Sequence, residues 1–199
     1  MARTVKVCIS SFLENMNHEF PNSDITISRR GYKVDGDLGI KYTCNYMEYK
    51  SVDYFKVVDG EHFTLIEFSD LIAQNKQLET RMTKIKASDL EPDEKRRLRK
   101  SLNNTINREL VSKFKDSIFI LGKLKEDLDN IPLKFDEKPK YLIVVAPFDS
   151  YLGDTDKIDI ARFLEMLKDK VTQAIPTKIF SRVIINSLDQ CKFLANVNE

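Results

Sequence analysis

Two acidic residues on neighbouring predicted strands are the residues of this sequence best placed to do chemistry. Asp53 belongs to the run 52–58 and Glu67 to the run 63–68, with thirteen residues between the two acids. Both runs are rich in β-branched and aromatic residues, and an Asp-Gly pair separates them, which is typical of a β-hairpin. If three residues form the connecting loop, Asp53 and Glu67 face each other on the same side of the sheet.

Two carboxylates at cross-strand distance repel each other unless a cation lies between them or one of them keeps its proton. Oxygen ligands of this kind suit Mg²⁺ or Mn²⁺, which bind through one or two carboxylates, waters and substrate phosphate. The pair therefore predicts a metal site formed by Asp53 and Glu67. A loop of two or four residues would offset the pairing by one, and the alternative is two ordinary acids on a half-solvated sheet face.

Asp53, thirteen residues and then Glu67-Phe68-Ser69 on a hydrophobic hairpin resembles the motif of the PD-(D/E)xK nuclease superfamily. The expected order helix–strand–strand–strand–helix–strand is also similar to the core of that superfamily, over residues 4–80 and more loosely over 141–185. The resemblance implies that Asp53 and Glu67 bind the metal ion and that the reaction is hydrolysis of phosphodiester bonds in DNA or RNA. It also implies an assisting acid on the first helix, Glu14 or Glu19.

The sequence departs from the family at the lysine that orients the attacking water, because Ser69 stands at that position. Some members carry the lysine on the next helix, and there the resemblance implies Lys76. Gln74 or Gln77 matches a glutamine that some members carry on that helix. If none of these residues replaces the lysine, the chain is a non-catalytic nucleic-acid-binding or protein-interaction (regulatory) protein on a degenerate nuclease-like scaffold.

A second register also matches the family pattern and includes its lysine. Asp35 is followed, after twelve residues, by Glu48-Tyr49-Lys50. We rank this register second because Asp35 lies in a predicted turn and the run 45–48 is a less buried strand than the run 65–67.

The densest charge run is a candidate nucleic-acid-binding surface. It comprises Lys95, Arg96, Arg97, Arg99 and Lys100. Such cations can hold a phosphate backbone, with Lys84 and Lys86 nearby in the sequence. The alternative is a solvated helix face, paired in part with the acids at 91, 93 and 94.

The pattern of apolar residues predicts an α/β (α+β) protein with a mixed central sheet, an antiparallel hairpin and flanking helices. Residues 1–199 are expected to form a single domain with a helical elaboration at about 71–130. Pro92 suits a first helical turn, and Asn103-Asn104 is a candidate interruption. The other expected elements are a helix at 4–20, strands at 25–28 and 40–50, a buried strand at 141–146, a helix at 159–175 and a strand at 183–185. The apolar stripe from 98 to 128 is expected to be buried against the sheet, with a homodimer seam as the alternative.

Composition excludes several classes of protein. The 199 residues are 42% hydrophobic and carry a net charge of +1, so a folded core is expected and overall charge indicates no partner. No apolar run reaches membrane-spanning length, and the N-terminus does not resemble a signal peptide.

Cys8, Cys44 and Cys191 form no metal-binding spacing, which predicts buried reduced thiols and a cytoplasmic (intracellular) protein without membrane contact. Neither a GxGxxG nor a P-loop motif occurs, and both histidines, His18 and His62, are expected to be solvated.

Overall fold

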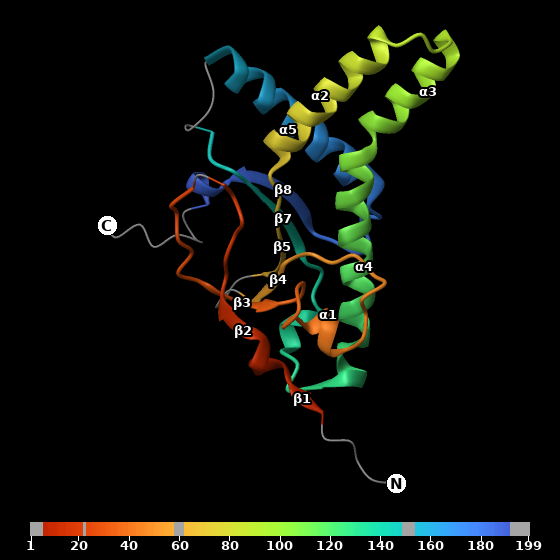
Figure 1. Cartoon of the computed structure of the whole chain (residues 1–199). Helices are drawn as coiled ribbons and strands as arrows, with labels where there is room; N and C mark the ends of the chain where they lie inside the picture. The colour runs from red at the N-terminus through yellow and green to blue at the C-terminus, as the bar shows by residue number, and fades with distance from the viewer. Residues whose placement is uncertain (1–5, 22, 58–61, 149–153, 192–199) are drawn as a thin grey trace.

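The structure is a computed structural model that describes residues 6–21, 23–57, 62–148 and 154–191. It is an α/β fold in which a six-stranded mixed sheet has the order β2-β3-β4-β5-β7-β8 (Figure 1). The strands are β1 (Val7–Cys8), β2 (Leu13–Asn15), β3 (Arg30–Lys33), β4 (Tyr54–Val57), β5 (Phe63–Phe68), β6 (Leu128–Asp129), β7 (Lys140–Val145) and β8 (Arg182–Ser187). The helices are α1 (Ile40–Thr43), α2 (Leu71–Ala87), α3 (Pro92–Asn103), α4 (Thr105–Asp127) and α5 (Asp154–Ala174), with 3₁₀ helices η1 (Ile9–Phe12), η2 (Leu133–Asp136) and η3 (Leu188–Gln190).

The sheet divides into an antiparallel half and a parallel half. Strands β2 to β5 pair antiparallel in sequence order, whereas β5, β7 and β8 pair parallel. Parallel neighbours need a crossover, and α2 to α4 supply it between β5 and β7 while α5 supplies it between β7 and β8. Strand β5 is therefore central, and the acid-bearing hairpin β4–β5 adjoins the first crossover.

The hairpin register agrees with the pairing that the sequence predicts. Tyr54 pairs with Ile66, and Phe55 pairs with Leu65. Continuing the same register by one position sets Asp53 opposite Glu67, although Asp53 itself precedes the first residue of β4. The predicted turn residues Asp59 to Glu61 lie outside the described residues.

Side chains alternate between two apolar clusters on the two sides of the sheet. Phe55 and Leu65 belong to the larger cluster, together with Phe114 of α4. Tyr54 and Ile66 belong to the smaller cluster on the other side. Because alternate residues of a strand point to the same side, Asp53 and Glu67 share the side of the sheet that α4 covers.

Helices α2 and α3 extend away from the sheet as an arm, here called the α2–α3 arm and comprising residues 71–103 (Figure 1). Pro92 occupies the first turn of α3, as the sequence predicts, and the helical run is interrupted at Asn104. Only Leu71 and Ile72 are buried in α2, and no residue is buried in α3. The arm therefore presents most of its surface to solvent.

The predicted helix at 4–20 is wrong over the described residues. The segment forms β1, η1 and β2 in succession, and β2 pairs with β3 through Leu13 and Tyr32. Its apolar residues Ile9, Phe12 and Met16 are buried as an amphipathic pattern requires. The serines, asparagines and β-branched residues between them favour helices weakly, so pairing with the edge of the sheet determines the local structure.

The predicted strands at 25–28 and 40–50 are wrong as well. Residues 25–28 have no regular structure, and residues 40–50 begin with the short helix α1 and continue as turns. Asn45 has a φ of 59°, which no strand residue adopts. Both edges of β3 are already occupied, by β2 and β4, so the tyrosine-rich segment has no strand to pair with there.

The later elements match the prediction closely. Strand β7 matches the expected strand at 141–146 to within one residue at each end. Helix α5 includes most of the expected helix at 159–175 but begins five residues earlier, and β8 extends the expected strand at 183–185 at both ends. The apolar stripe of α4, including Ile106, Leu110 and Phe114, is buried in the chain's own core. Among the described residues, no helix is both long and apolar enough to cross a membrane.

Candidate functional site

Asp53 is held rigidly at the point where β4 begins. Its backbone N–H donates to the carbonyl of Ile66 at 3.1 Å, and its carbonyl accepts from the N–H of Val34 at 2.8 Å. Its carboxylate Oδ2 accepts a hydrogen bond of 2.6 Å from the N–H of Phe68. The Asp53 side chain therefore bridges the start of β4 and the end of β5.

Glu67 is almost completely buried near the end of β5, with 2% of its side chain exposed. Its Oε1 accepts a 2.6 Å hydrogen bond from Nζ of Lys113, which α4 contributes from above the sheet. Its Oε2 is buried and has no hydrogen-bond partner in the described structure. A buried carboxylate oxygen without a partner is costly and calls for a proton, a water or a cation.

The two acids perturb each other's protonation. Burial raises the pKa of Asp53 to about 6, against the opposing effects of the Phe68 N–H and Lys113. Burial and the charge of Asp53 raise the pKa of Glu67, and Lys113 counteracts them. Burial alone would lower the pKa of Lys113, but Glu67 raises it overall. The half-buried Lys113 is therefore paired with two carboxyl groups whose charged forms burial disfavours.

A cavity of about 330 Å³ adjoins Asp53. Lys33, Asp35 and Glu19 line it together with Asp53, so it is polar and contains charges of both signs. Asp35 forms an ion pair with Lys41 at 2.5 Å, which helps to lower the pKa of Asp35 against the effect of its burial. The cavity gives solvent and small polar molecules a route to the Asp53 carboxylate.

His18 also lines this cavity, which differs from its predicted solvated position. Its Nε2 lies 2.6 Å from the carbonyl of Ile25, its Nδ1 lies 3.2 Å from the N–H of Phe20, and its ring stacks on Phe20. The Nε2 must therefore donate and the Nδ1 must accept, and both nitrogens are engaged. His18 consequently shapes the cavity wall. His62 is exposed, as expected.

The two candidates for an assisting acid lie in different surroundings. Glu14 lies on β2, where its Oε1 accepts from the Tyr54 hydroxyl at 3.1 Å and pairs with Lys33 at 3.3 Å. Glu19 lines the cavity beside Asp53 and contributes to the raised pKa of Asp53. Of the two, Glu19 is the one that reaches the candidate site.

The residues predicted to replace the family lysine are not the ones that contact the acid pair. Ser69 is buried, and its hydroxyl accepts a 3.2 Å hydrogen bond from the amide of Gln74. Lys76 and Gln77 are exposed on α2, and neither lines the cavity beside Asp53. Lys113, on the third crossover helix, occupies the cationic position next to Glu67.

Lys113 was missed by the sequence reasoning, although the sequence contains a signal for it. It follows Ile106 by seven residues and Leu110 by three, so it lies on the buried face of α4. A lysine within an apolar helical stripe needs a buried anion as a partner. Pattern alone does not indicate which acid that is.

The second register is only partly assembled. Glu48 is exposed and lies in a turn, so it cannot serve as the strand-borne acid of the motif. Asp35, its first acid, lines the same cavity as Asp53 and raises the pKa of Asp53. The fold therefore brings the first acids of both registers together and leaves Glu48-Tyr49-Lys50 outside.

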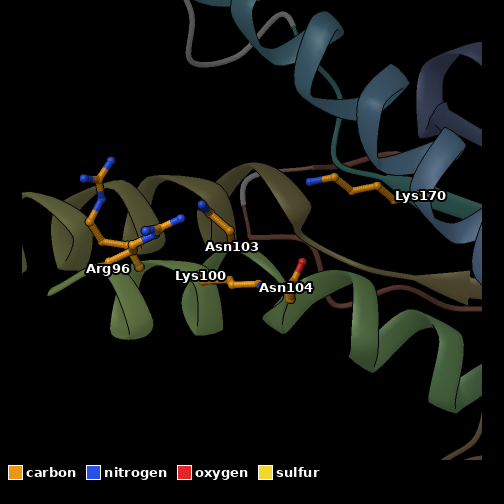
Figure 2. A pocket seen from close by; sticks show the side chains of 6 residues that line it. Arg96, Lys100, Asn103, Asn104 and Lys170 are labelled. Atoms are coloured by element: carbon orange, nitrogen blue, oxygen red, sulfur yellow. The ribbon is translucent and has the colours of Figure 1, made fainter. Parts of the chain in front are cut away.

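The predicted basic run lies on α3, and four of its five residues are exposed. Arg96, Arg99 and Lys100 line an open cleft of about 470 Å³, to which α5 adds Lys170 (Figure 2). The cations therefore gather along one side of the α2–α3 arm.

The comparisons with known proteins assign no family to the chain. No family model matches the sequence, and neither the curated proteins nor the solved structures give a match. Among the described residues, no group of three or more histidine, cysteine or acidic side chains is arranged to hold a metal ion. Asp53, Glu67 and Lys113 remain the group of side chains whose chemistry indicates a function.

Proposed function

We propose that this chain is a metal-dependent nuclease-like domain that hydrolyses phosphodiester bonds of DNA or RNA at Asp53 and Glu67. The observation that carries the proposal is the buried Oε2 of Glu67, which has no partner in the described structure and shares its side of the sheet with the half-buried carboxylate of Asp53. Structural acids on a sheet face are normally solvated or fully paired. A half-satisfied pair of this kind is typical of a site completed by a ligand.

The donor atoms are of the chemical type that Mg²⁺ and Mn²⁺ prefer. Glu67 Oε2 and the Asp53 oxygen that does not accept from Phe68 offer two hard oxygen ligands. Two carboxylates suffice for Mg²⁺ because waters and substrate phosphate complete its coordination. When bound, such an ion polarises a phosphoryl oxygen and lowers the pKa of a bound water.

The residues of the chain would divide the remaining work. Asp53 and Glu67 hold the metal ion in place, since the Phe68 N–H and the Lys113 ammonium orient one oxygen of each acid. Lys113, with 21% of its side chain exposed, can approach a phosphate oxygen or the attacking water. It supplies the role that the family resemblance assigns to a lysine, in place of Ser69 or Lys76.

The basic run of α3 supports nucleic acid as the substrate class. Residues 71–103 contain nine basic and five acidic side chains, so the arm carries a net charge of +4 and the rest of the chain −3. Charge that segregates in this way attracts a phosphate backbone even when the whole protein is nearly neutral.

The test is a cleavage assay on plasmid DNA, single-stranded DNA and RNA with Mg²⁺, Mn²⁺ or EDTA. Cleavage is expected to require the metal and to be lost in Asp53→Asn, Glu67→Gln and Lys113→Met. Asp169→Asn, an exposed acid on α5, is the matched control and should cleave normally. Metal-dependent cleavage that survives both Asp53→Asn and Glu67→Gln would show that the site lies elsewhere.

A second candidate function is non-catalytic nucleic-acid binding or regulation on the same scaffold. Lys113 already neutralises one oxygen of Glu67, and Ser69 is engaged by Gln74, which favours a pair retained for structure. Absence of cleavage by folded protein, together with absence of metal binding to Asp53 and Glu67, would support this candidate. Retained binding of nucleic acid by α3 would then define the activity.

We also infer a reducing, cytoplasmic environment from the cysteines. Cys8, Cys44 and Cys191 are all free thiols, and Cys191 is buried. Disulfides are rare where thiols are kept reduced. Cell fractionation with a tagged chain tests the location, and recovery in a secreted fraction would contradict it.

A further inference from the structure

A basic cleft and an apolar hollow meet at the base of the α2–α3 arm. The cleft has a volume of about 470 Å³ and is lined by Arg96, Arg99 and Lys100 of α3 and by Lys170 of α5. Asn103 and Asn104 add polar side chains at the junction of α3 and α4. Figure 2 shows Lys170 reaching from α5 toward Asn103, opposite the cations of α3.

The adjoining hollow has a volume of about 160 Å³ and lies among α2, α4 and α5. Asn103 and Lys170 line both spaces, so the hollow opens directly beside the cations. Its apolar lining consists of Leu78, Met82, Ile106, Phe163, Met166 and Leu167. Met166 is 59% exposed, so the apolar lining of the hollow is accessible from solvent beside Lys170.

The basic cleft and the apolar hollow differ in the charge of the side chains that line them. No acidic side chain lines the basic cleft in the described structure. Glu79 is the acid that lines the hollow, where its Oε1 accepts a 2.8 Å hydrogen bond from Asn75. An anionic group is therefore attracted to the cleft, while the hollow accepts an uncharged, largely apolar group.

We propose that this composite site binds a nucleoside phosphate, with the phosphate among Arg96, Arg99, Lys100 and Lys170 and the base in the hollow against Phe163 and Met166. Arginine forks and lysine ammonium groups match phosphate oxygens in charge and geometry. Aromatic rings and methionine thioethers stack on flat bases with little sequence preference. A basic face evolved only for solubility would not need an apolar hollow at its edge.

This site shares Arg96, Arg99 and Lys100 with the basic run that supports the proposed function, but it does not depend on the nuclease centre. None of its residues belongs to the Asp53–Glu67–Lys113 group. The nucleoside phosphate could be a free nucleotide or one unpaired nucleotide of a single strand. In a strand, the remaining basic side chains of α3 would contact neighbouring phosphates. A free nucleotide would use only the composite site.

The chain contains no tryptophan, so a single introduced indole gives a clean fluorescence signal. Met166→Trp places it at the rim of the hollow, at a position exposed enough to tolerate the change. The probes are AMP, inorganic phosphate, adenosine and a dA oligonucleotide, titrated without metal ions. We expect saturable quenching by AMP or by the oligonucleotide, and at least tenfold weaker binding of adenosine and of inorganic phosphate.

Lys170→Glu in the Met166→Trp background is expected to weaken binding at least tenfold, whereas Lys178→Glu, an exposed lysine outside both spaces, leaves it unchanged. Tight binding of AMP identifies a nucleotide site, and binding of the oligonucleotide alone identifies a strand site. The proposal is overturned if neither probe quenches saturably, or if Lys170→Glu binds as the parent does. Circular dichroism of each variant confirms folding, and a misfolded Lys170→Glu is replaced by Arg99→Gln, for which the same criterion holds.

Discussion

Lys113 Nζ lies 2.6 Å from Glu67 Oε1 and joins α4 to β5 across 46 positions of the sequence. Glu67 is buried on the sheet, and the lysine approaches from the helix that covers it. The close contact with Lys113 compensates for the removal of the Glu67 carboxylate from water. It therefore links the stability of the fold to the candidate site.

Removal of the lysine charge should destabilise the protein strongly. In Lys113→Met, Glu67 remains buried beside Asp53 without a compensating cation, and breaking a buried pair costs about 3–5 kcal/mol of unfolding free energy. Urea denaturation at pH 8 measures the loss. Lys113→Arg serves as the control that retains the charge. A loss of unfolding free energy below about 1 kcal/mol for Lys113→Met would show that the Asp53 and Glu67 carboxyl groups are uncharged at pH 8.

The raised pKa of Asp53 predicts a specific pH dependence of stability. With a folded pKa of about 6 against a usual value of 3.8, the folded state binds a proton in this interval that the unfolded state has released. The stabilisation is complete below the unfolded pKa and is lost as pH rises through about 6. Asp53→Asn removes this loss while its side-chain oxygen can still accept from the Phe68 N–H.

Asp53→Asn should therefore gain stability relative to the parent chain as pH rises from 4 to 8, by up to about 3 kcal/mol for a shift of this size. Chemical denaturation of both proteins at several pH values checks it. A difference in unfolding free energy that stays constant with pH would mean that the Asp53 carboxyl titrates normally.

Metal binding should stabilise the protein if Asp53 and Glu67 form the proposed site. A ligand that binds only the folded state at one hundred times its Kd adds about 2.7 kcal/mol. Thermal unfolding with and without Mg²⁺ or Mn²⁺ measures the shift at pH 8. Burial raises the pKa of Glu67 to about 8, so protons compete with the metal ion for this acid, and the shift is expected to be smaller at pH 6. The shift is expected to vanish in Asp53→Asn and in Glu67→Gln and to persist in Asp169→Asn. Equal shifts in all four proteins would indicate unspecific ion effects.

Binding of nucleic acid by the basic run should depend steeply on salt. Each phosphate contact contributes about 0.7 to 0.9 to the slope of log K against log salt concentration. The double variant Arg96→Gln/Arg97→Gln should bind all sequences more weakly and reduce the slope by about 1 for each contact that is lost. Fluorescence anisotropy with a labelled oligonucleotide at several salt concentrations measures both. An unchanged slope would assign these arginines to a solvated helix face.

Part of the candidate site is predictable from local pattern. The alternation in 52–58 and 63–68 and the Asp-Gly pair between them predict the hairpin, and the register that the structure shows sets Asp53 opposite Glu67. Pro92 and Asn103-Asn104 likewise predict where α3 begins and ends. These features depend on local backbone preferences and on the two-residue period of a strand. Both are set by residues close to one another in the sequence.

Other parts could not be predicted in this way. The apolar spacing of residues 9–16 fits a helix, yet an available sheet edge beside β3 makes Leu13–Asn15 a strand. The tyrosine-rich segment 40–50 fits a strand, yet β3 has no free edge to accept it. In both cases pairing partners distant in the sequence outweigh a weak local preference.

Local patterns in the sequence are enough to predict that Asp53 and Glu67 can share one side of a hairpin, that a helical segment follows, and that cations concentrate at residues 95–100. Packing of the elements brings Lys113 to Glu67, places Asp35 and Glu19 beside Asp53, and sets Lys170 opposite the arginines of α3. The difference arises because periodicity specifies which face of an element is buried. Which residues then meet across that face depends on how the elements pack.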